Sequence, residues 1–179
     1  PEAIESYGSA VQVHQLDGVE PCHLPAATRD QLLLDPEPAD LSVYLEDDLV
    51  LQDPLSLDKW LWFAQITQHR AVLMPHRFEP VAGRGKAYVD GAISSAYLQS
   101  LAWPEGQPFE AKFWPGCPVA FQPASNPHAG VFALSGPQRQ LLRQCMPLPL
   151  DGFVGPLETA ATATVAAHWP VFKPAWRQR

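Results

Sequence analysis

The sequence predicts an α/β fold with a mixed, mostly parallel sheet flanked by helices, and three observations support this prediction. Apolar segments of strand character alternate along the chain with segments that carry helix start signals. The chain has 179 residues, 46% of them hydrophobic, which is enough for one domain with a substantial core. Its 20 prolines are scattered, which indicates short elements joined by irregular loops. We therefore expect a single domain over residues 1–179.

The first part of the chain predicts two strands and two helices. Residues 10–16 alternate between apolar and polar side chains, which is typical of a strand, and residues 28–34 form a candidate short helix. The apolar run 41–45 predicts a buried strand. Residues 56–67 predict a helix with Ser56 as its N-cap.

The second part predicts two further strands and two further helices around an irregular segment. Residues 71–75 and 131–135 are apolar and have strand character. The second of these strands runs into a helix whose first position is marked by Pro137, and residues 155–168 repeat the pattern. Residues 76–127 mix turn signals and aromatics, so we expect an insertion of strands and loops there.

The charge of the chain is unevenly distributed. Residues 1–58 contain 13 acidic residues and a single base, Arg29, whereas residues 59–179 contain 6 acidic residues and 11 bases. The overall net charge of -7 argues against nonspecific binding of nucleic acid. The basic second part still suits a small anionic ligand held beside an acidic, metal-loaded first part.

Cysteine usage and hydropathy predict a cytoplasmic protein without a membrane span. Cys22, Cys117 and Cys145 are odd in number and far apart, which favours reduced thiols over a disulfide framework or a zinc site. No window approaches the roughly 18 apolar residues of a membrane helix, and no signal peptide opens the sequence.

The stretch DLSVYLEDDLVL, residues 40–51, places three consecutive carboxylates, Glu46, Asp47 and Asp48, at the end of a predicted strand. Two like charges about 4 Å apart repel by roughly 4 kcal/mol at an effective dielectric near 20, against about 1 kcal/mol in water. A hard cation such as Mg²⁺ or Mn²⁺ prefers oxygen ligands and would remove this repulsion. The carboxyl ends of strands in open α/β sheets are also where ligands bind. A solvated acidic loop after the strand fits the composition equally well.

Three segments resemble known enzymes. The apolar strand followed by LEDD resembles the D-x-D-type motif of GT-A glycosyltransferases, which use a divalent metal to transfer a sugar from a nucleotide diphosphate donor. NPHAGVFALSGPQ, residues 126–138, and GPLETAATATVAAHWPVFKP, residues 155–174, resemble members of bacterial glycosyltransferase-like families. The resemblance implies a GT-A-like, Rossmann-like fold. Only 45 residues precede Glu46, so the N-terminal nucleotide-binding strands of that fold would be abbreviated or absent.

The resemblance also assigns roles to single carboxylates. It implies that Asp48 contacts the metal directly, while Glu46 and Asp47 hold the ribose of the donor or act as further metal ligands. It implies that Glu158 is the general base of an inverting enzyme, which takes the proton of the acceptor hydroxyl; Asp151 is the second candidate for this role. The preference for acidic residues in the first turn of a helix also accounts for Glu158.

The remaining candidates lie in loops. His128 is a candidate metal ligand or phosphate contact, and a loop hydrogen bonder is the alternative. Asn126 would orient the acceptor or shape its turn. Arg77, Arg84 and Lys86 are candidates to close over the diphosphate of the donor, because guanidinium groups match phosphate oxygens. A solvated hairpin explains the same three residues.

The sequence therefore predicts a hexosyltransferase-like enzyme that depends on Mn²⁺ or Mg²⁺. Its partners would be a nucleotide-sugar donor and a carbohydrate or other hydroxyl acceptor. One alternative is a GT-A-like module or fragment that binds a metal or carbohydrate without catalysis. Another is a phosphoryl-transfer or hydrolase domain built on the same acidic strand end.

Overall fold

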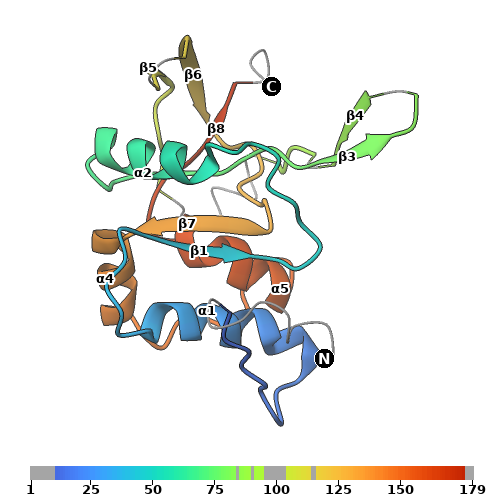
Figure 1. Cartoon of the computed structure of the whole chain (residues 1–179), viewed down its shortest axis with the longest axis vertical. Helices are drawn as coiled ribbons and strands as arrows, with labels where there is room; N and C mark the ends of the chain where they lie inside the picture. Colours follow the sequence, from blue (N-terminus) through green and yellow to red (C-terminus); the bar gives the residue numbers. More distant parts are fainter. Residues whose placement is uncertain (1–10, 84, 90, 95–103, 114–115, 176–179) are drawn as a thin grey trace.

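A computed structural model of the chain shows a mixed α/β fold of helices and a curled mixed sheet (Figure 1). The structure describes residues 11–83, 85–89, 91–94, 104–113 and 116–175. The helical elements are η2 (Pro21–His23), α1 (Leu24–Leu34), α2 (Ser56–Ile66), α4 (Gly136–Gln144), α5 (Pro156–Glu158), the π-helical η3 (Thr159–Ala163) and α6 (Thr164–Ala166). The strands are β1 (Leu41–Leu45), β2 (Val72–Leu73), β3 (Phe78–Val81), β4 (Gly85–Tyr88), β5 (Phe109–Lys112), β6 (Pro118–Pro123), β7 (Val131–Ser135) and β8 (Val171–Pro174).

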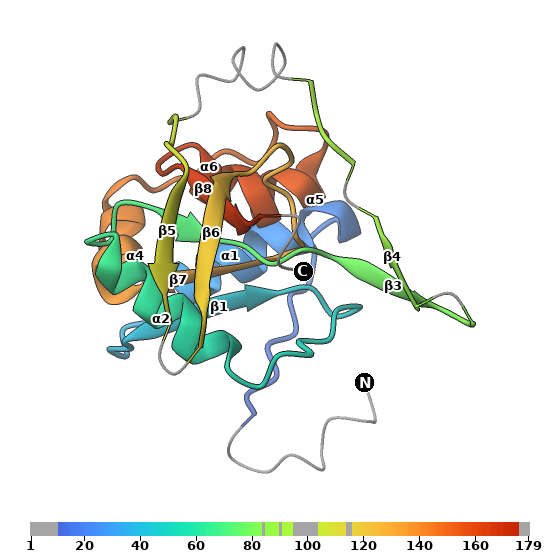
Figure 2. The same ribbon diagram turned by 90° about the horizontal axis from the view of Figure 1, so that it is seen from above.

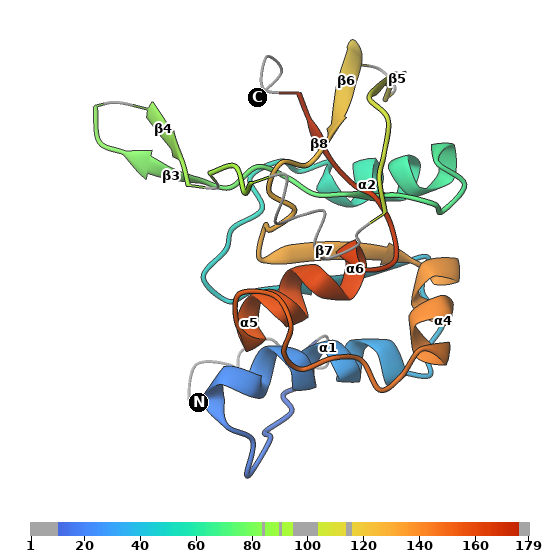
Figure 3. The ribbon, with the colours of Figure 1, turned by 180° about the vertical axis from the view of Figure 1, so that it is seen from behind.

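Strands β1 and β7 form an antiparallel pair at the centre of the molecule, with Leu45 opposite Val131. In Figures 1 and 3 this pair lies between α2 on one side and α1, α5 and α6 on the other. Every residue of β7 is buried, which matches its mostly apolar sequence, VFALS. The strand predictions for residues 41–45 and 131–135 are therefore confirmed, and the end of β1 is fixed against the start of β7.

The remaining strands form a four-stranded sheet of order β2-β8-β6-β5 and a separate β3–β4 hairpin. Of the five strand pairings in the described residues, only β2 with β8 is parallel. The prediction of a mostly parallel sheet is therefore wrong. Parallel neighbours need a long crossover connection. Here β5 and β6 form a hairpin instead, and β8 returns between β2 and β6 in the direction opposite to β6.

Two other predictions from local pattern fail. Residues 11–16 form no strand, although the sequence predicts one over residues 10–16. Alternation indicates a strand only where one face is buried, and Val11 and Val13 are 41% and 65% exposed. Ser56 is the first residue of α2 and not its N-cap; its hydroxyl donates to the backbone oxygen of Asp53.

The helix predicted for residues 155–168 forms as three consecutive pieces. Residue Pro156 opens α5 as expected, but the chain then widens into the π-helical turn η3 before α6 completes it. The described residues of the segment predicted as an insertion, 76–127, contain β3, β4, β5 and β6. Strand β6 within it pairs with β8, so this segment supplies part of the main sheet. Figure 2 shows the β3–β4 hairpin projecting away from the body of the molecule.

Two apolar clusters hold the elements together. The larger packs the β1–β7 pair against α1, α4 and η3, and includes Leu33, Phe132, Leu142 and Val165. The smaller packs Phe63 of α2 against Phe121 of β6 and Phe172 of β8. The β1–β7 pair is therefore packed in the larger cluster, and the turn that follows β1 begins where this packed pair ends.

A carboxylate cluster at the end of strand β1

The three predicted carboxylates lie in the turn that follows β1. The backbone N–H of Glu46 donates to the carbonyl oxygen of Gly130 over 3.0 Å, and the N–H of Leu49 donates to the carbonyl oxygen of Glu46 over 3.2 Å. Glu46 is half-buried, whereas Asp47 and Asp48 are exposed. The turn is therefore joined to the loop before β7 at one backbone hydrogen bond.

Gly130 packs directly against the side chain of Glu46. Its φ of +63° lies in the left-handed region, which glycine adopts readily. A Cβ atom added to Gly130 would overlap Oε2 of Glu46 and lie 2.7 Å from Cδ1 of Leu49. The carboxylate of Glu46 thus rests against a residue that has no side chain, and a larger residue would displace it.

Burial and four charged groups act on the pKa of the Glu46 carboxyl group. Burial contributes most to raising the pKa of the Glu46 carboxyl group, and the charge of Asp48 raises it further. The guanidinium of Arg77 opposes this shift. The carboxylates of Glu158 and Asp47 add to it. Residues from three distant parts of the chain therefore interact at this turn, and negative charge is in excess among them.

Glu158 reaches this cluster from the C-terminal part of the chain. It ends α5, which begins at Pro156 after the extended residue Gly155. Its side chain is half-buried and folds back, so that a Cβ atom on Gly155 would lie 3.2 Å from Oε2 of Glu158. The second candidate for the general base, Asp151, is exposed in the loop before α5. It is not among the charges that shift the pKa of Glu46.

The predicted basic residues divide between the cluster and the hairpin. Arg77 lies half-buried between β2 and β3 and acts on Glu46. Lys86 lies exposed on β4, with Nζ 4.0 Å from the centroid of the Phe78 ring, and is not among the charges that shift the pKa of Glu46. Arg84 lies outside the described residues. Of the described members of this basic group, Arg77 alone acts on Glu46.

The loop before β7 is shaped by polar side chains. The side-chain oxygen of Asn126 accepts from the backbone N–H of His128 over 3.0 Å, and its Nδ2 donates to the carbonyl oxygen of Gly91 over 2.9 Å. These contacts fit the turn-shaping alternative for Asn126. A hydrogen bond of 2.6 Å joins Nδ1 of His128 to Oγ1 of Thr162, so a metal ion could be bound by this ring only through Nε2.

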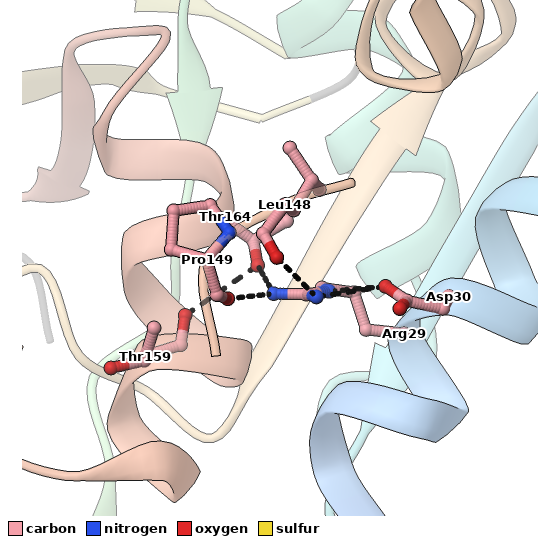
Figure 4. A network of polar contacts seen from close by, with 6 residues as sticks. All are labelled: Arg29, Asp30, Leu148, Pro149, Thr159 and Thr164. Carbon is pink, nitrogen blue, oxygen red and sulfur yellow. Dashed lines mark hydrogen bonds and ion pairs between the residues drawn. The ribbon is translucent and has the colours of Figure 1, made fainter. Parts of the chain in front are cut away.

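A buried arginine supports the helix that carries Glu158. Arg29 of α1 is 1% exposed, and Figure 4 shows its guanidinium lying between Asp30 on one side and Leu148, Pro149 and Thr164 on the other. It donates to the carbonyl oxygen of Pro149 over 2.8 Å and to Oγ1 of Thr164 over 3.3 Å, and it pairs with Asp30 over 2.8 Å. The single base of the acidic N-terminal part is therefore buried, and it joins α1 to the segment before α5 and to Thr164.

The donor set suits a hard divalent cation, although no complete ligand group is preformed. Carboxylate oxygens are the ligands that Mg²⁺ and Mn²⁺ prefer, and the excess negative charge at Glu46 would be offset by such an ion. Among the described residues, no group of three or more His, Cys, Asp and Glu side chains is arranged to hold a metal ion. Magnesium sites commonly take only one or two carboxylates from the protein.

A separate hollow of about 260 Å³ lies between α2 and the four-stranded sheet. Its walls include Trp60, Trp62, Met74 and Phe121, and the ion-paired Asp53 and Lys59 also line it. None of the predicted site residues that the structure describes lines this hollow. It is therefore distinct from the carboxylate cluster.

Sequence reasoning missed the residues that support the cluster. Gly130, Thr162 and Arg29 had no assigned role, because their partners lie far away in the chain. The one available signal was Arg29, which is the lone base among 13 acidic residues in residues 1–58. A single base kept in so acidic a segment indicates a specific partner.

No protein-family model, no curated protein and no solved structure was found to match this chain. In the part of the chain that the structure describes, no helix has the length and apolar character needed to cross a membrane.

Proposed function

We propose that this protein is a metal-dependent glycosyltransferase, which transfers a sugar from a nucleotide diphosphate donor to an acceptor hydroxyl. The observation that carries the proposal is the position of Glu46, which is half-buried against Gly130, where the charges of Asp48 and Glu158 add to burial in raising the pKa of its carboxyl group and Arg77 opposes the shift. Glu158 follows Glu46 by more than 100 residues in the chain, and its charge nevertheless acts on the Glu46 carboxyl group.

Each residue of the cluster has a distinct task in this proposal. Asp48 and Glu46 would hold a divalent cation, which neutralises the diphosphate as it leaves the sugar. Arg77 would donate hydrogen bonds to the phosphate oxygens of the donor. Glu158 would accept the proton of the acceptor hydroxyl while the acceptor oxygen bonds to the sugar and the bond to the diphosphate breaks. Inversion at the sugar carbon follows from this single displacement.

Asp48→Asn tests the metal step. The amide keeps the size of the side chain but removes its charge, so we expect loss of Mn²⁺-dependent hydrolysis or transfer of uridine and guanosine diphosphate sugars. Asp58→Asn is a matched control, because Asp58 is an exposed acidic residue in the first turn of α2. Undiminished turnover by Asp48→Asn would refute the assignment.

Glu158→Gln tests the base. We expect turnover to fall by about 10²- to 10⁴-fold, the usual contribution of a general base, while calorimetry shows that the variant still binds the nucleotide diphosphate with Mn²⁺. Glu110→Gln, on the exposed side of β5, is the control. Equal loss of donor binding and turnover would show that Glu158 does not act at the proton-transfer step.

A non-catalytic module that binds a metal or carbohydrate is the second candidate. It is favoured by the described residues before β1, which form η2 and α1 and no strand, so they supply no nucleotide-binding strands. Calorimetry with uridine and guanosine diphosphates plus Mn²⁺ separates the candidates. A module without a base pocket should release little heat, whereas a transferase should bind the nucleotide measurably.

A further inference from the structure

The loop before β7 is joined to three other parts of the chain. The carbonyl oxygen of Gly130 accepts from the N–H of Glu46, and Nζ of the buried Lys173 donates to the carbonyl oxygen of His128 over 2.7 Å. The His128 side chain turns the other way, to Thr162 in η3. One short loop thus contacts the acidic turn, strand β8 and the π-helical turn η3 that follows Glu158.

Thr162 is the helix side of this connection. It is 0% exposed, and its part-buried hydrogen bond with Nδ1 of His128 gives its hydroxyl a partner inside the protein, where an unpaired polar group is costly. Side chains four positions apart project from the same side of a helix. Thr162 therefore lies one turn along from Glu158 on the side that faces the loop.

The helix that contains the π-helical turn contacts two different segments, the loop before β7 and helix α1. The N–H of Thr164 donates to the carbonyl oxygen of Thr159, five residues back, which marks the widened turn. Thr162 then meets His128, while Thr164 meets Arg29 (Figure 4). Widened turns of this kind frequently occur at functional sites.

We infer that Thr162 is a positioning residue for the carboxylate cluster. Through His128 it fixes the loop on which Glu46 rests, and it thereby holds Glu46 at a set position relative to Glu158. The catalytic purpose of this role rests on the proposed function, because a metal-bound donor and a general base must face the same sugar. The effect of Thr162 on the position of Glu46 does not depend on that function and can be measured without a ligand.

Amide hydrogen exchange of the intact protein tests the role without a ligand. Thr162→Val keeps the shape and the β-branch but removes the hydroxyl. We expect exchange of the Glu46 amide to quicken about tenfold, the factor that the loss of one buried hydrogen bond implies, while amides of the β1–β7 ladder change by less than about twofold. Thr162→Ser restores the hydroxyl and should restore slow exchange.

Two further variants keep the test decisive. Thr164→Val removes a buried hydroxyl from the same helix that bonds Arg29 and not the loop, so exchange at Glu46 should stay near the wild-type rate. His128→Leu removes the same bond from the other side and replaces Thr162→Val if that variant does not fold. Unchanged exchange at Glu46 in both Thr162→Val and His128→Leu would overturn the inference.

Mn²⁺ titration of the same variants separates this inference from the proposed function. If both are correct, Thr162→Val weakens Mn²⁺ binding and slows turnover, and Thr162→Ser recovers both. If the wild type binds no Mn²⁺ and transfers no sugar, the proposed function fails. Faster exchange at Glu46 in Thr162→Val would still uphold the positioning role in that case.

Discussion

At the scale of single residues, Glu46 is held in a place that disfavours its charge. Its backbone N–H donates to the carbonyl oxygen of Gly130, its carboxylate packs against that glycine, and burial and acidic groups raise its pKa. A raised pKa means that the folded protein binds the Glu46 proton more tightly than the unfolded chain does. The ionised side chain therefore lowers the free energy of unfolding as the pH rises above its ordinary pKa of 4.5.

Glu46→Gln should therefore stabilise the protein in the absence of divalent cations. We expect a gain of at most about 1 kcal/mol near pH 7, because the carboxylate is partly solvated, and no gain at about pH 3, where Glu46 is protonated in both states. Urea unfolding at both pH values checks this. Glu110→Gln is the control, and equal gains at the two pH values would contradict the electrostatic explanation.

The residues of the site were predictable where the signal was local. Glu46, Asp47 and Asp48 stand together in the sequence, and Glu158 follows a helix-starting Pro156. Their association came only from the resemblance to glycosyltransferases. The bond between His128 and Thr162 joins residues 34 positions apart, and no local pattern indicates it.

At the scale of elements, α1 and the helix from α5 to α6 are joined by Arg29. Its guanidinium donates to Pro149 and Leu148 carbonyl oxygens and to Thr164, which leaves these acceptors satisfied inside the protein (Figure 4). Buried acceptors that lose such a donor are costly, because water does not replace it. The position of Glu158 thus depends on a residue of the first long helix.

Arg29→Met should destabilise the protein by about 3 kcal/mol, the upper end of the cost of leaving buried polar groups unpaired. Asp30→Asn is the comparison, because Asp30 is 32% exposed and water can replace its partner. We expect it to lose less than about 1 kcal/mol. Equilibrium unfolding in urea measures the free energy of unfolding of both variants. Similar losses in the two variants would show that the ion pair with Asp30, and not the hydrogen bonds to the carbonyl oxygens, provides the stabilisation.

Elements were predictable where one pattern dominated. Strands β1 (LSVYL) and β7 (VFALS) are mostly apolar. Helix α4 has a capping box of Ser135 and Gln138, with Pro137 as its second residue. Strand β8 was missed because four residues next to prolines show no alternation; neighbouring strands define it. The prediction of mostly parallel strands was wrong for the same reason, because segments far apart in the chain decide which strands pair and in which direction.

At the scale of the whole molecule, the uneven charge of the chain concentrates acidic residues before residue 59. The turn after β1 belongs to this acidic part, while Arg77 comes from the basic part. A ligand that carries both a divalent cation and phosphates complements such a boundary. Binding of the cation alone should already stabilise the folded protein, because the unfolded chain has no assembled cluster.

Mn²⁺ should therefore raise the melting temperature. At a concentration 100 times the dissociation constant, the expected stabilisation is about 2.7 kcal/mol, or roughly 5–11 °C for a chain of this size. Thermal unfolding with and without Mn²⁺ measures it. Asp48→Asn should abolish the shift and Asp58→Asn should keep it; the same shift in all three proteins would place the bound ion elsewhere.

Strand β8 lies between β2 and β6, although it follows all the other described strands in the chain. A nascent chain that has left the ribosome only as far as residue 170 lacks the strand that joins β2 to the β5–β6 hairpin. The edges of β2 and β6 then stay open, and open edges attract other chains. Because β8 is synthesised after the strands on both sides of it, the four-stranded sheet cannot be completed until β8 emerges from the ribosome.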